Sequence, residues 1–249
     1  MIERSLNFSA HDWDASKAGA GMVIRTLRDN DIPTHIKNKA LVARRRRQIV
    51  DAAVDLFLKN GFHKTTTRQI ARSAGISIGL LYEYITTKED ILFLVCDAIH
   101  EEMTAAVTEA LARTEKRLHP LAVAIREYFL VCHRLSDHIV LIYQEIHSLP
   151  ANWRKVVMEN ETHITGLFAQ VLEGLIVAGE MPDMEESALD LAAHNISVLG
   201  HMWAFRRWLL ARYYTIDEYI EIQTGFLLNR YLGASWQTPG AADQPAEGE

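Results

Sequence analysis

Apolar side chains recur at helical spacing along most of the chain, beginning near residue 44. Between residues 44 and 60 they fall three, four, seven and eight positions apart, which predicts an amphipathic helix with one buried stripe made of Ile49, Ala52, Ala53, Leu56 and Phe57. Asn60-Gly61 ends this helix, because glycine adopts the left-handed conformation of a helix end without a steric penalty.

Two short helices are predicted next. Thr66 and Gln69 have the spacing of a capping box, so a helix opens there and runs to Ala74. Gly75 makes a turn, and Ser77 caps a third helix over residues 78–84. Two short helices joined by a tight glycine turn form a helix-turn-helix, which places its second helix in the major groove of DNA.

The rest of the chain, to about residue 232, shows further helical segments and no convincing strand. A helix capped by Thr86 or Thr87 comes first, and capping residues, prolines and glycines divide the remainder into helices over about 120–135, 137–148, 152–178, 184–212 and 216–232. Asp183 with Glu186, and Thr215 with Glu218, are expected to cap the last two. The sequence therefore predicts an all-α fold, with a three-helix helix-turn-helix head ahead of a larger helical body.

Charge separates the head from the body. Residues 37–88 contain eleven lysines and arginines against three acids, a balance of +8, whereas the whole chain carries a net charge of −6. The run Arg44 to Arg47 contributes four of these bases, although such a run also solvates the start of a helix. A basic helix-turn-helix is the footprint expected for phosphate contact, and an acidic body disfavours non-specific wrapping of DNA.

The segment TTTRQIARSAGISIGLLYEYITTKEDIL, residues 65–92, is similar to the signature of TetR-family transcriptional regulators. It departs from that pattern at Ile85, where phenylalanine is usual, and at Ile78 and Leu80, where polar or small residues are more common. The resemblance implies that backbone phosphates are contacted by Thr66, Ser77, Tyr82, Tyr84 and Lys88. It implies that Ile78, Gly79 and Leu80 face base edges, with apolar contact to thymine methyls. Arg68 is a candidate polar reader; alternatively, Ile78 or Leu80 packs inward beside Leu81.

The resemblance also implies domain boundaries and partners. We expect a flexible extension over 1–39, the DNA-binding domain over 40–88, a ligand-binding and dimerisation domain over 89–232, and a disordered tail over 233–249. In such proteins the last two helices form a four-helix interface between two copies. The chain is therefore expected to bind a palindromic operator as a two-fold homodimer and to repress transcription until an effector releases it.

The effector is expected to be small and hydrophobic. The segment CHRLSDHIVLIYQEIHSLP resembles the bodies of TetR-type regulators of fatty-acid and CoA-thioester metabolism, which implies an acyl-CoA. The candidate pocket residues are His133, Tyr143, Gln144, Phe168 and Trp203. Arginines available for CoA phosphates are Arg134, Arg206, Arg207 and Arg212; the alternative is that all of these are ordinary core and surface residues.

A metal-responsive regulator is one alternative. Asp190, His194 and His201 lie four and seven residues apart, on one predicted helical face, and their side chains suit zinc or nickel. Possible additional ligands are His133, His138 and His163. A polar seam on an interface helix would give the same spacing. Cys96 and Cys132 lie in apolar helical contexts, where a redox role is not expected.

Other functional classes are less well supported. The chain has no nucleophile elbow, P-loop, dinucleotide-binding glycine motif or zinc-protease motif, so we expect neither an enzyme nor a cofactor. A DNA-organising protein with this fold and no small ligand is the remaining alternative. No apolar run is long enough for a signal peptide or membrane helix, so a cytoplasmic location without membrane contact is expected.

Overall fold

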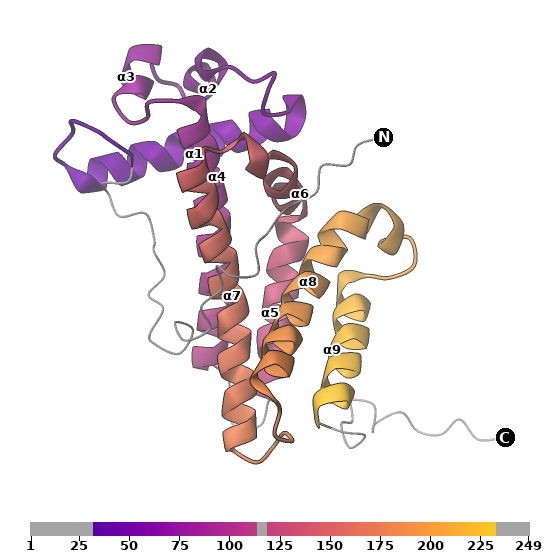
Figure 1. The fold of residues 1–249 in the computed structure, drawn as a ribbon. Coiled ribbons are helices and arrows are strands. Elements are labelled where there is room, and N and C mark those ends of the chain that lie inside the picture. The colour runs from indigo at the N-terminus through magenta and orange to yellow at the C-terminus, as the bar shows by residue number, and fades with distance from the viewer. Residues whose placement is uncertain (1–31, 114–118, 233–249) are drawn as a thin grey trace, which may run out of the picture.

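The computed structural model describes residues 32–113 and 119–232, which form α-helices joined by short turns (Figure 1). Three helices make the head: α1 (Lys39–Asn60), α2 (Thr67–Ser73) and α3 (Ile78–Tyr82). The body contains α4 (Lys88–Arg113), α5 (Pro120–Arg134), α6 (Ser136–Glu145), a 3-10 turn η2 (Ile146–Ser148), α7 (Ala151–Val177), α8 (Glu186–Leu210) and α9 (Ile216–Leu232). The all-α prediction is confirmed.

Most of the predicted helix ends are confirmed by their hydrogen bonds. Gly61 closes α1 with a φ of 79°, in the region that favours glycine. Thr66 and Gln69 form the complete capping box of α2, and the Ser77 hydroxyl accepts from the backbone N–H of Leu80 at 3.1 Å. Thr215 and Glu218 likewise cap the start of α9, with the Glu218 carboxylate accepting from the Thr215 N–H at 2.7 Å.

Two predicted boundaries were wrong. Helix α3 ends at Tyr82, two residues earlier than expected. Helix α8 begins at Glu186 without a side-chain cap, because the Asp183 carboxylate accepts from the adjacent N–H of Met184 and reaches no further along the chain.

The N-terminal segment departs from the flexible extension expected over residues 1–39. Residues 1–31 lie outside the described residues, as does the tail over 233–249, but residues 32–38 pack against the head. Ile32 is completely buried, and the Thr34 hydroxyl donates to the carbonyl of Glu83 at 2.7 Å. This segment therefore closes the side of the head where α3 ends.

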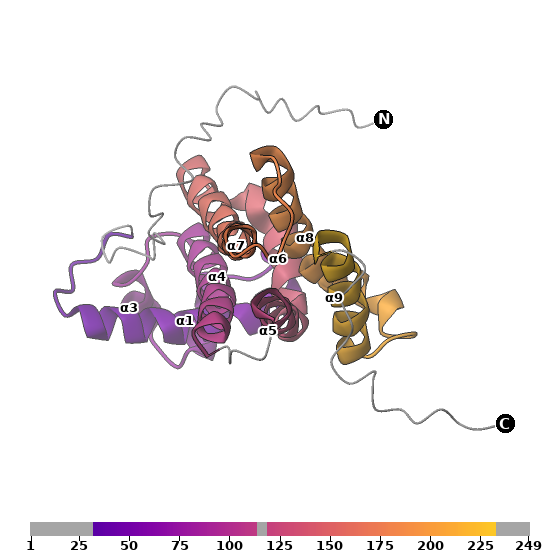
Figure 2. The same ribbon diagram turned by 90° about the horizontal axis from the view of Figure 1, so that it is seen from below.

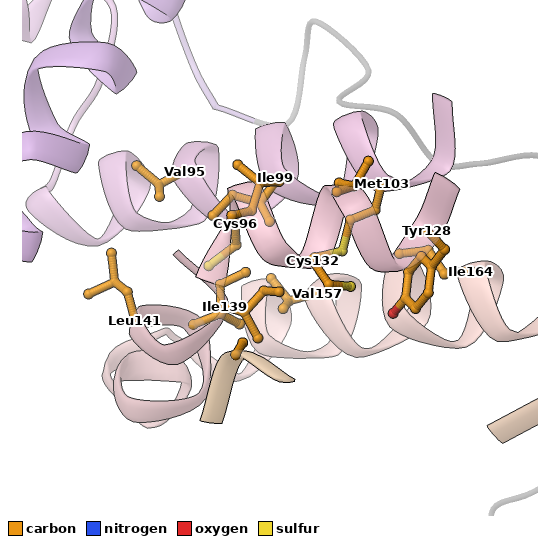
Figure 3. Packing of buried hydrophobic residues seen from close by; sticks show 14 of the residues in the cluster. Val95, Cys96, Ile99, Met103, Tyr128, Cys132, Ile139, Leu141, Val157 and Ile164 are labelled. Carbon is orange, nitrogen blue, oxygen red and sulfur yellow. The ribbon is translucent and has the colours of Figure 1, made fainter. Parts of the chain in front are cut away.

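The body core lies where α4, α5 and α7 meet (Figure 3). The central side chains include Ile99 and Met103 from α4, Cys132 from α5 and Ile164 from α7, all at most 4% exposed. Helices α8 and α9 lie together at one flank of the body (Figure 2). None of the described helices combines the length and apolarity needed to cross a membrane.

Gly200 on α8 marks the closest approach of that helix to α5. A Cβ atom there would lie 2.7 Å from Cε1 of Tyr128 and 3.0 Å from Sγ of Cys132. Both neighbours are buried, so neither moves away without disturbing the core.

We therefore expect Gly200→Ala to lower the free energy of unfolding by about 1–3 kcal/mol, the usual cost of overpacking a core. Gly174→Ala is the matched control, because nothing lies within 4 Å of its added Cβ and alanine favours a helix interior by roughly 0.5–1 kcal/mol. Urea unfolding followed by circular dichroism at one protein concentration measures both changes. Equal stability of the two variants would contradict the close packing at Gly200.

Candidate DNA-binding interface and body site

The second helix of the helix-turn-helix, α3, presents a mixed surface. Ile78 is 37% exposed and Gly79 has open space beside it, whereas Leu80 is half-buried and packs against the core. Leu81 is completely buried, as predicted. Leu80 is thus partly packed inward, which was the alternative prediction for Ile78 or Leu80. Ile78 is the apolar side chain that α3 exposes most.

The polar residues expected at the phosphates divide into two groups. Thr66, Arg68 and Ser77 are exposed at the starts of α2 and α3, and Tyr82 is half exposed. The Tyr82 hydroxyl lies 3.0 Å from that of Thr67, which fixes its ring across the two short helices. Tyr84 is only 2% exposed, because it follows the end of α3 and packs in the head core, so it is removed from the proposed contact set.

Lys88 has a role inside the protein. Its ammonium group donates to the carbonyls of Phe62 at 2.9 Å and Thr65 at 3.2 Å, and lies 4.2 Å from the centre of the Phe62 ring. The first residue of α4 therefore holds the turn that leads into α2. This contact positions the head on the body and is independent of any contact with DNA.

The arginines of the run on α1 also differ in their exposure. Arg44 and Arg47 are exposed and line a hollow of about 480 Å³ between α1 and the end of α2. Arg46 is 6% exposed and donates to the carbonyls of Ile32 at 2.7 Å and Tyr84 at 3.2 Å. Two arginines of the run are thus exposed to solvent, and a buried one ties the N-terminal segment to the end of the helix-turn-helix.

Helix α4 connects head and body through a row of polar contacts with α7. At its first turn, Asp90 accepts from the backbone N–H groups of Thr86 and Thr87, both at 2.9 Å. The other carboxylate oxygen accepts from the indole N–H of Trp153 at 3.3 Å, and the Trp153 ring stacks on Phe93 with centroids 4.1 Å apart.

Two further contacts continue this row along the helix pair. The Asn160 amide donates to the Asp97 carboxylate at 3.2 Å, and His100 Nε2 lies 3.2 Å from Glu161 Oε2. Residue numbers rise together on both helices, so α4 and α7 run parallel. We call these three pairs, Trp153–Asp90, Asn160–Asp97 and Glu161–His100, the α4–α7 polar row.

The last pair of this row, Glu161–His100, leads into a group of polar side chains inside the body. His201 on α8 is 2% exposed; its Nε2 lies 2.9 Å from the Tyr128 hydroxyl and its Nδ1 lies 3.1 Å from the Tyr143 hydroxyl. Glu161 Oε1 is 3.5 Å from the same Nδ1, and the Ser197 hydroxyl is 3.2 Å from that of Tyr128. These five residues, of which Tyr143 and Glu161 are partly exposed, are called the buried polar cluster below.

Electrostatics within the cluster favours an ionised carboxylate beside a neutral imidazole. Burial lowers the pKa of His201, although Glu161 opposes that shift. Burial also opposes ionisation of Glu161, yet the hydrogen bond from His100 and the neighbouring imidazoles bring its pKa below the usual value. Burial raises the pKa of the Tyr128 hydroxyl, which stays protonated.

The predicted pocket residues do not form one pocket. Trp203 donates to His133 Nδ1 at 2.9 Å, and the Phe168 ring packs edge-on against Tyr128. Tyr143 belongs to the buried polar cluster, but Gln144 lines a separate hollow of about 410 Å³ between α1 and α6. The residues therefore fall into three places in the body, of which the cluster carries the most hydrogen-bonding groups.

The proposed phosphate-binding arginines are distributed over the surface. Arg207 forms an ion pair with Asp137, and Arg134 lies 3.4 Å from Glu102. Arg206 lies over the ring of Trp208 at 5.4 Å, and Arg212 is exposed in the turn after α8. They do not converge with the cluster on one site.

The metal alternative is not supported by the geometry. His201 is hydrogen-bonded to two tyrosine hydroxyls inside the body. His194 is instead exposed, and its Nδ1 lies 3.0 Å from the backbone carbonyl of Asp190. Within residues 32–113 and 119–232, no three His, Cys, Asp or Glu side chains are grouped to hold a metal ion. Cys96 and Cys132 are buried thiols; burial raises the pKa of Cys96 to about 12 and raises that of Cys132 further, so neither is a reactive thiolate.

Comparison with known proteins agrees with this geometry. Residues 49–95 match the family model described as bacterial regulatory proteins, tetR family. The chain is 30% identical over 207 residues to the HTH-type transcriptional regulator HbdR of Aromatoleum sp. (strain CIB), covering 82% of this chain and 87% of that protein. The chain belongs to the TetR family. It is a transcriptional regulator with an N-terminal helix-turn-helix.

Further transcriptional regulators resemble parts of the chain in sequence or in fold. The fatty acid metabolism regulator protein of Bacillus subtilis is 26% identical over 153 residues, covering 61% of this chain and 77% of that protein. A structure of FadR from Bacillus subtilis in complex with stearoyl-CoA superposes with a TM-score of 0.60 at 21% identity, covering 75% and 98% of the two chains. A structure of AibR with isovaleryl coenzyme A and operator DNA gives a TM-score of 0.60 at 17% identity, covering 73% and 97%.

Sequence reasoning missed the residues that connect the two halves of this TetR-family protein. Asp90 and Trp153 were not singled out as functional residues. Glu161 and Tyr128 were also overlooked. The available signal for Glu161 was a carboxylate in the middle of an amphipathic helix. That signal does not identify its partners, because they lie on helices that are distant in sequence.

The two neighbouring arginines of α1 provide a direct test of these assignments. Arg46→Met should lower the free energy of unfolding by about 2–3 kcal/mol, because two buried carbonyls lose a charged donor. Arg47→Met should change it by less than about 0.5 kcal/mol, as expected for an exposed site. Urea unfolding of both variants measures the difference. Similar stabilities would contradict the structural role of Arg46.

Proposed function

We propose that the protein is a dimeric repressor that binds a palindromic operator and releases it when a small acyl thioester, such as an acyl-CoA, enters the body. The observation that carries this proposal is the series of polar contacts that extends from the buried polar cluster, along the α4–α7 polar row, to the first turn of α4. That series joins a candidate sensing site to the part of α4 that holds the helix-turn-helix.

The proposed DNA surface combines charge with exposed polar groups. The head carries the +8 balance of residues 37–88. Thr66, Ser77 and Tyr82 are available to phosphates, with Arg44 and Arg47 as further basic contacts. Arg68 and Ile78 are the proposed base readers, the first by hydrogen bonds and the second by apolar contact with a thymine methyl.

The proposed dimer interface is the outer face of α8 and α9. Apolar side chains on this face are Leu191 at 62% exposed, Val198 at 58%, Trp208 at 64%, Ile222 at 41% and Phe226 at 66%. Exposed apolar groups gathered on adjacent helices are typical of a surface covered by another protein. A second copy is the proposed partner, since a two-fold dimer places two heads on two half-sites.

The proposed release follows from a shift between two conformations. One conformation spaces the two heads to fit the operator, and the other does not. An effector that binds the second conformation more tightly lowers the affinity for DNA. The size of that decrease is limited by the effector's difference in affinity for the two conformations. Helix α4 is the proposed moving element, because it has contacts at both ends of the proposed route. Its His100 lies beside Glu161 of α7, and its Lys88 holds the turn that leads into α2. The acyl-CoA class is supported by the regulators of similar fold that were solved with such ligands.

A ligand-independent DNA-organising protein is the second candidate. The close packing of α5 against α8 at Gly200 favours it, since an added Cβ there would already meet the buried side chains of Tyr128 and Cys132. The two candidates differ in whether any small molecule displaces DNA. The deciding experiment selects bound duplexes from a random library, then follows release of the selected duplex by fluorescence anisotropy during titration with acyl-CoAs of increasing length. Release by one of them supports the repressor, and indifference to all supports the second candidate.

Replacing Arg44 and Arg47 together by alanine should weaken binding to every duplex. Loss of two phosphate contacts per protomer, four per dimer, should reduce the slope of log affinity against log salt concentration by about 3–4. Arg68→Ala should instead relax preference at one base pair, by roughly 1–3 kcal/mol of discrimination. Anisotropy titrations on the selected duplex and its single-base variants at several salt concentrations measure both. A uniform loss for Arg68→Ala would remove it from the base readers.

Phe226→Glu should convert the dimer to a monomer at micromolar concentration, because a charge would be buried in the apolar interface. Val177→Glu is the matched control, since Val177 is 90% exposed at the end of α7 and lies outside the proposed interface. Sedimentation velocity gives the mass of each. A Phe226→Glu variant that stays dimeric would place the interface elsewhere.

A further inference from the structure

The buried polar cluster is costly for a helical core. Polar groups removed from water destabilise a protein unless each finds a partner, and apolar residues of similar size often pack at least as well. Nevertheless five helices contribute polar side chains to this one region: His100 from α4, Tyr128 from α5, Tyr143 from α6, Glu161 from α7 and His201 from α8. Such a concentration is typical of a site that recognises a ligand.

One polar atom in this region is left unsatisfied. His100 is 4% exposed and its Nε2 faces Glu161, but its buried Nδ1 has no hydrogen-bond partner among the described residues. Buried polar atoms without partners are uncommon, and each calls for an explanation such as a missing water or ligand.

Tyr143 closes the cluster from outside. Its side chain is 48% exposed, its hydroxyl bonds His201, and its ring packs edge-on against Phe205 with centroids 4.8 Å apart. Because half of this side chain already faces solvent, a rotation about its side-chain bonds opens the route to His201 without unfolding a helix.

We propose that the buried polar cluster is the polar subsite of the effector site, and that it binds a neutral hydroxyl or carbonyl group carried on the acyl part of the effector. This inference rests on the proposed function and narrows its ligand class. The effector is then an acyl thioester with an oxygen substituent on its chain, and not an unsubstituted fatty-acyl chain.

The hydrogen-bonding character of the cluster supports a neutral oxygen group. The hydroxyls of Tyr128, Tyr143 and Ser197 both donate and accept, and the His201 imidazole does so as well. A ligand hydroxyl or carbonyl exchanges into such a network without leaving partners unsatisfied. A hydrocarbon chain in the same place would break these bonds and replace none of them.

Charge disfavours an anionic ligand group, and the contacts already made by Glu161 disfavour a cationic one. A ligand carboxylate would meet the Glu161 carboxylate, which no lysine or arginine in the described contacts of the cluster neutralises. A ligand ammonium would compete with imidazoles that already lie 3.2 Å and 3.5 Å from the two Glu161 oxygens. A neutral group leaves these contacts in place.

The position of Glu161 explains how occupancy reaches DNA. Its carboxylate belongs both to the cluster and to the last pair of the α4–α7 polar row. A ligand bond to His201 or Glu161 therefore changes the contact that holds His100, and with it the register of α4 on α7. His100 is in this sense a positioning residue for the head.

The test compares two acyl-CoAs that differ by a single oxygen. Isothermal titration calorimetry of the full-length protein measures the affinities of 3-hydroxyoctanoyl-CoA and octanoyl-CoA. The hydroxylated probe should bind about tenfold more tightly, the net effect of one satisfied hydrogen bond. Tyr143→Phe should reduce this preference to about twofold. Tyr213→Phe, at a 71% exposed position in the turn after α8, is the matched control and should keep the full preference.

Three results would overturn the inference. Equal affinities of the two probes, or a preference undiminished in Tyr143→Phe, would show that the cluster does not read the oxygen. Tighter binding of octylamine than of either thioester would show a cationic subsite. If both thioesters displace DNA equally well, the proposed function stands and only this inference fails; if neither binds, the acyl thioester effector fails with it.

Discussion

The carboxylate of Asp90 joins three segments of the chain at the boundary between head and body. One oxygen accepts from the two backbone N–H groups that precede α4, and the other accepts from the indole of Trp153 on α7. Asp90 is 7% exposed, so these bonds form away from competing water. The start of α4, and through Lys88 the turn before α2, depends on where α7 holds this carboxylate. Any displacement of α7 relative to α4 is therefore transmitted to the head.

Between α4 and α7, buried polar contacts take the place of apolar packing that would contribute more to stability. Asp97 and Asn160 are 2% and 6% exposed and pair with each other in the middle of the helix interface. Buried pairs of this kind contribute little net stability, but they specify one register because the alternatives leave polar groups unpaired.

Local chemistry was sufficient to predict the helix-turn-helix and most helix ends. Thr66, Ser77 and Gly75 act within three or four residues, so their roles can be read from adjacent positions. The burial of Arg46 could not be read in this way, because its partners Ile32 and Tyr84 are brought to it only by the folded head. The same holds for the buried polar cluster, whose members span residues 128 to 201. Helical periodicity identifies which residues face inward, but not which of them meet.

The construction of α3 has a consequence for how the protein acquires new operators. This five-residue helix is held by the Ser77 cap and by buried Leu81, while Ile78 and Gly79 contribute little to the core. The residues that stabilise the fold and those proposed to face the groove are thus largely separate. Substitutions at positions 78 and 79 should accumulate with little loss of folding stability, so under the proposed function binding specificity is free to diverge among descendants of one gene while the proposed switch is inherited unchanged.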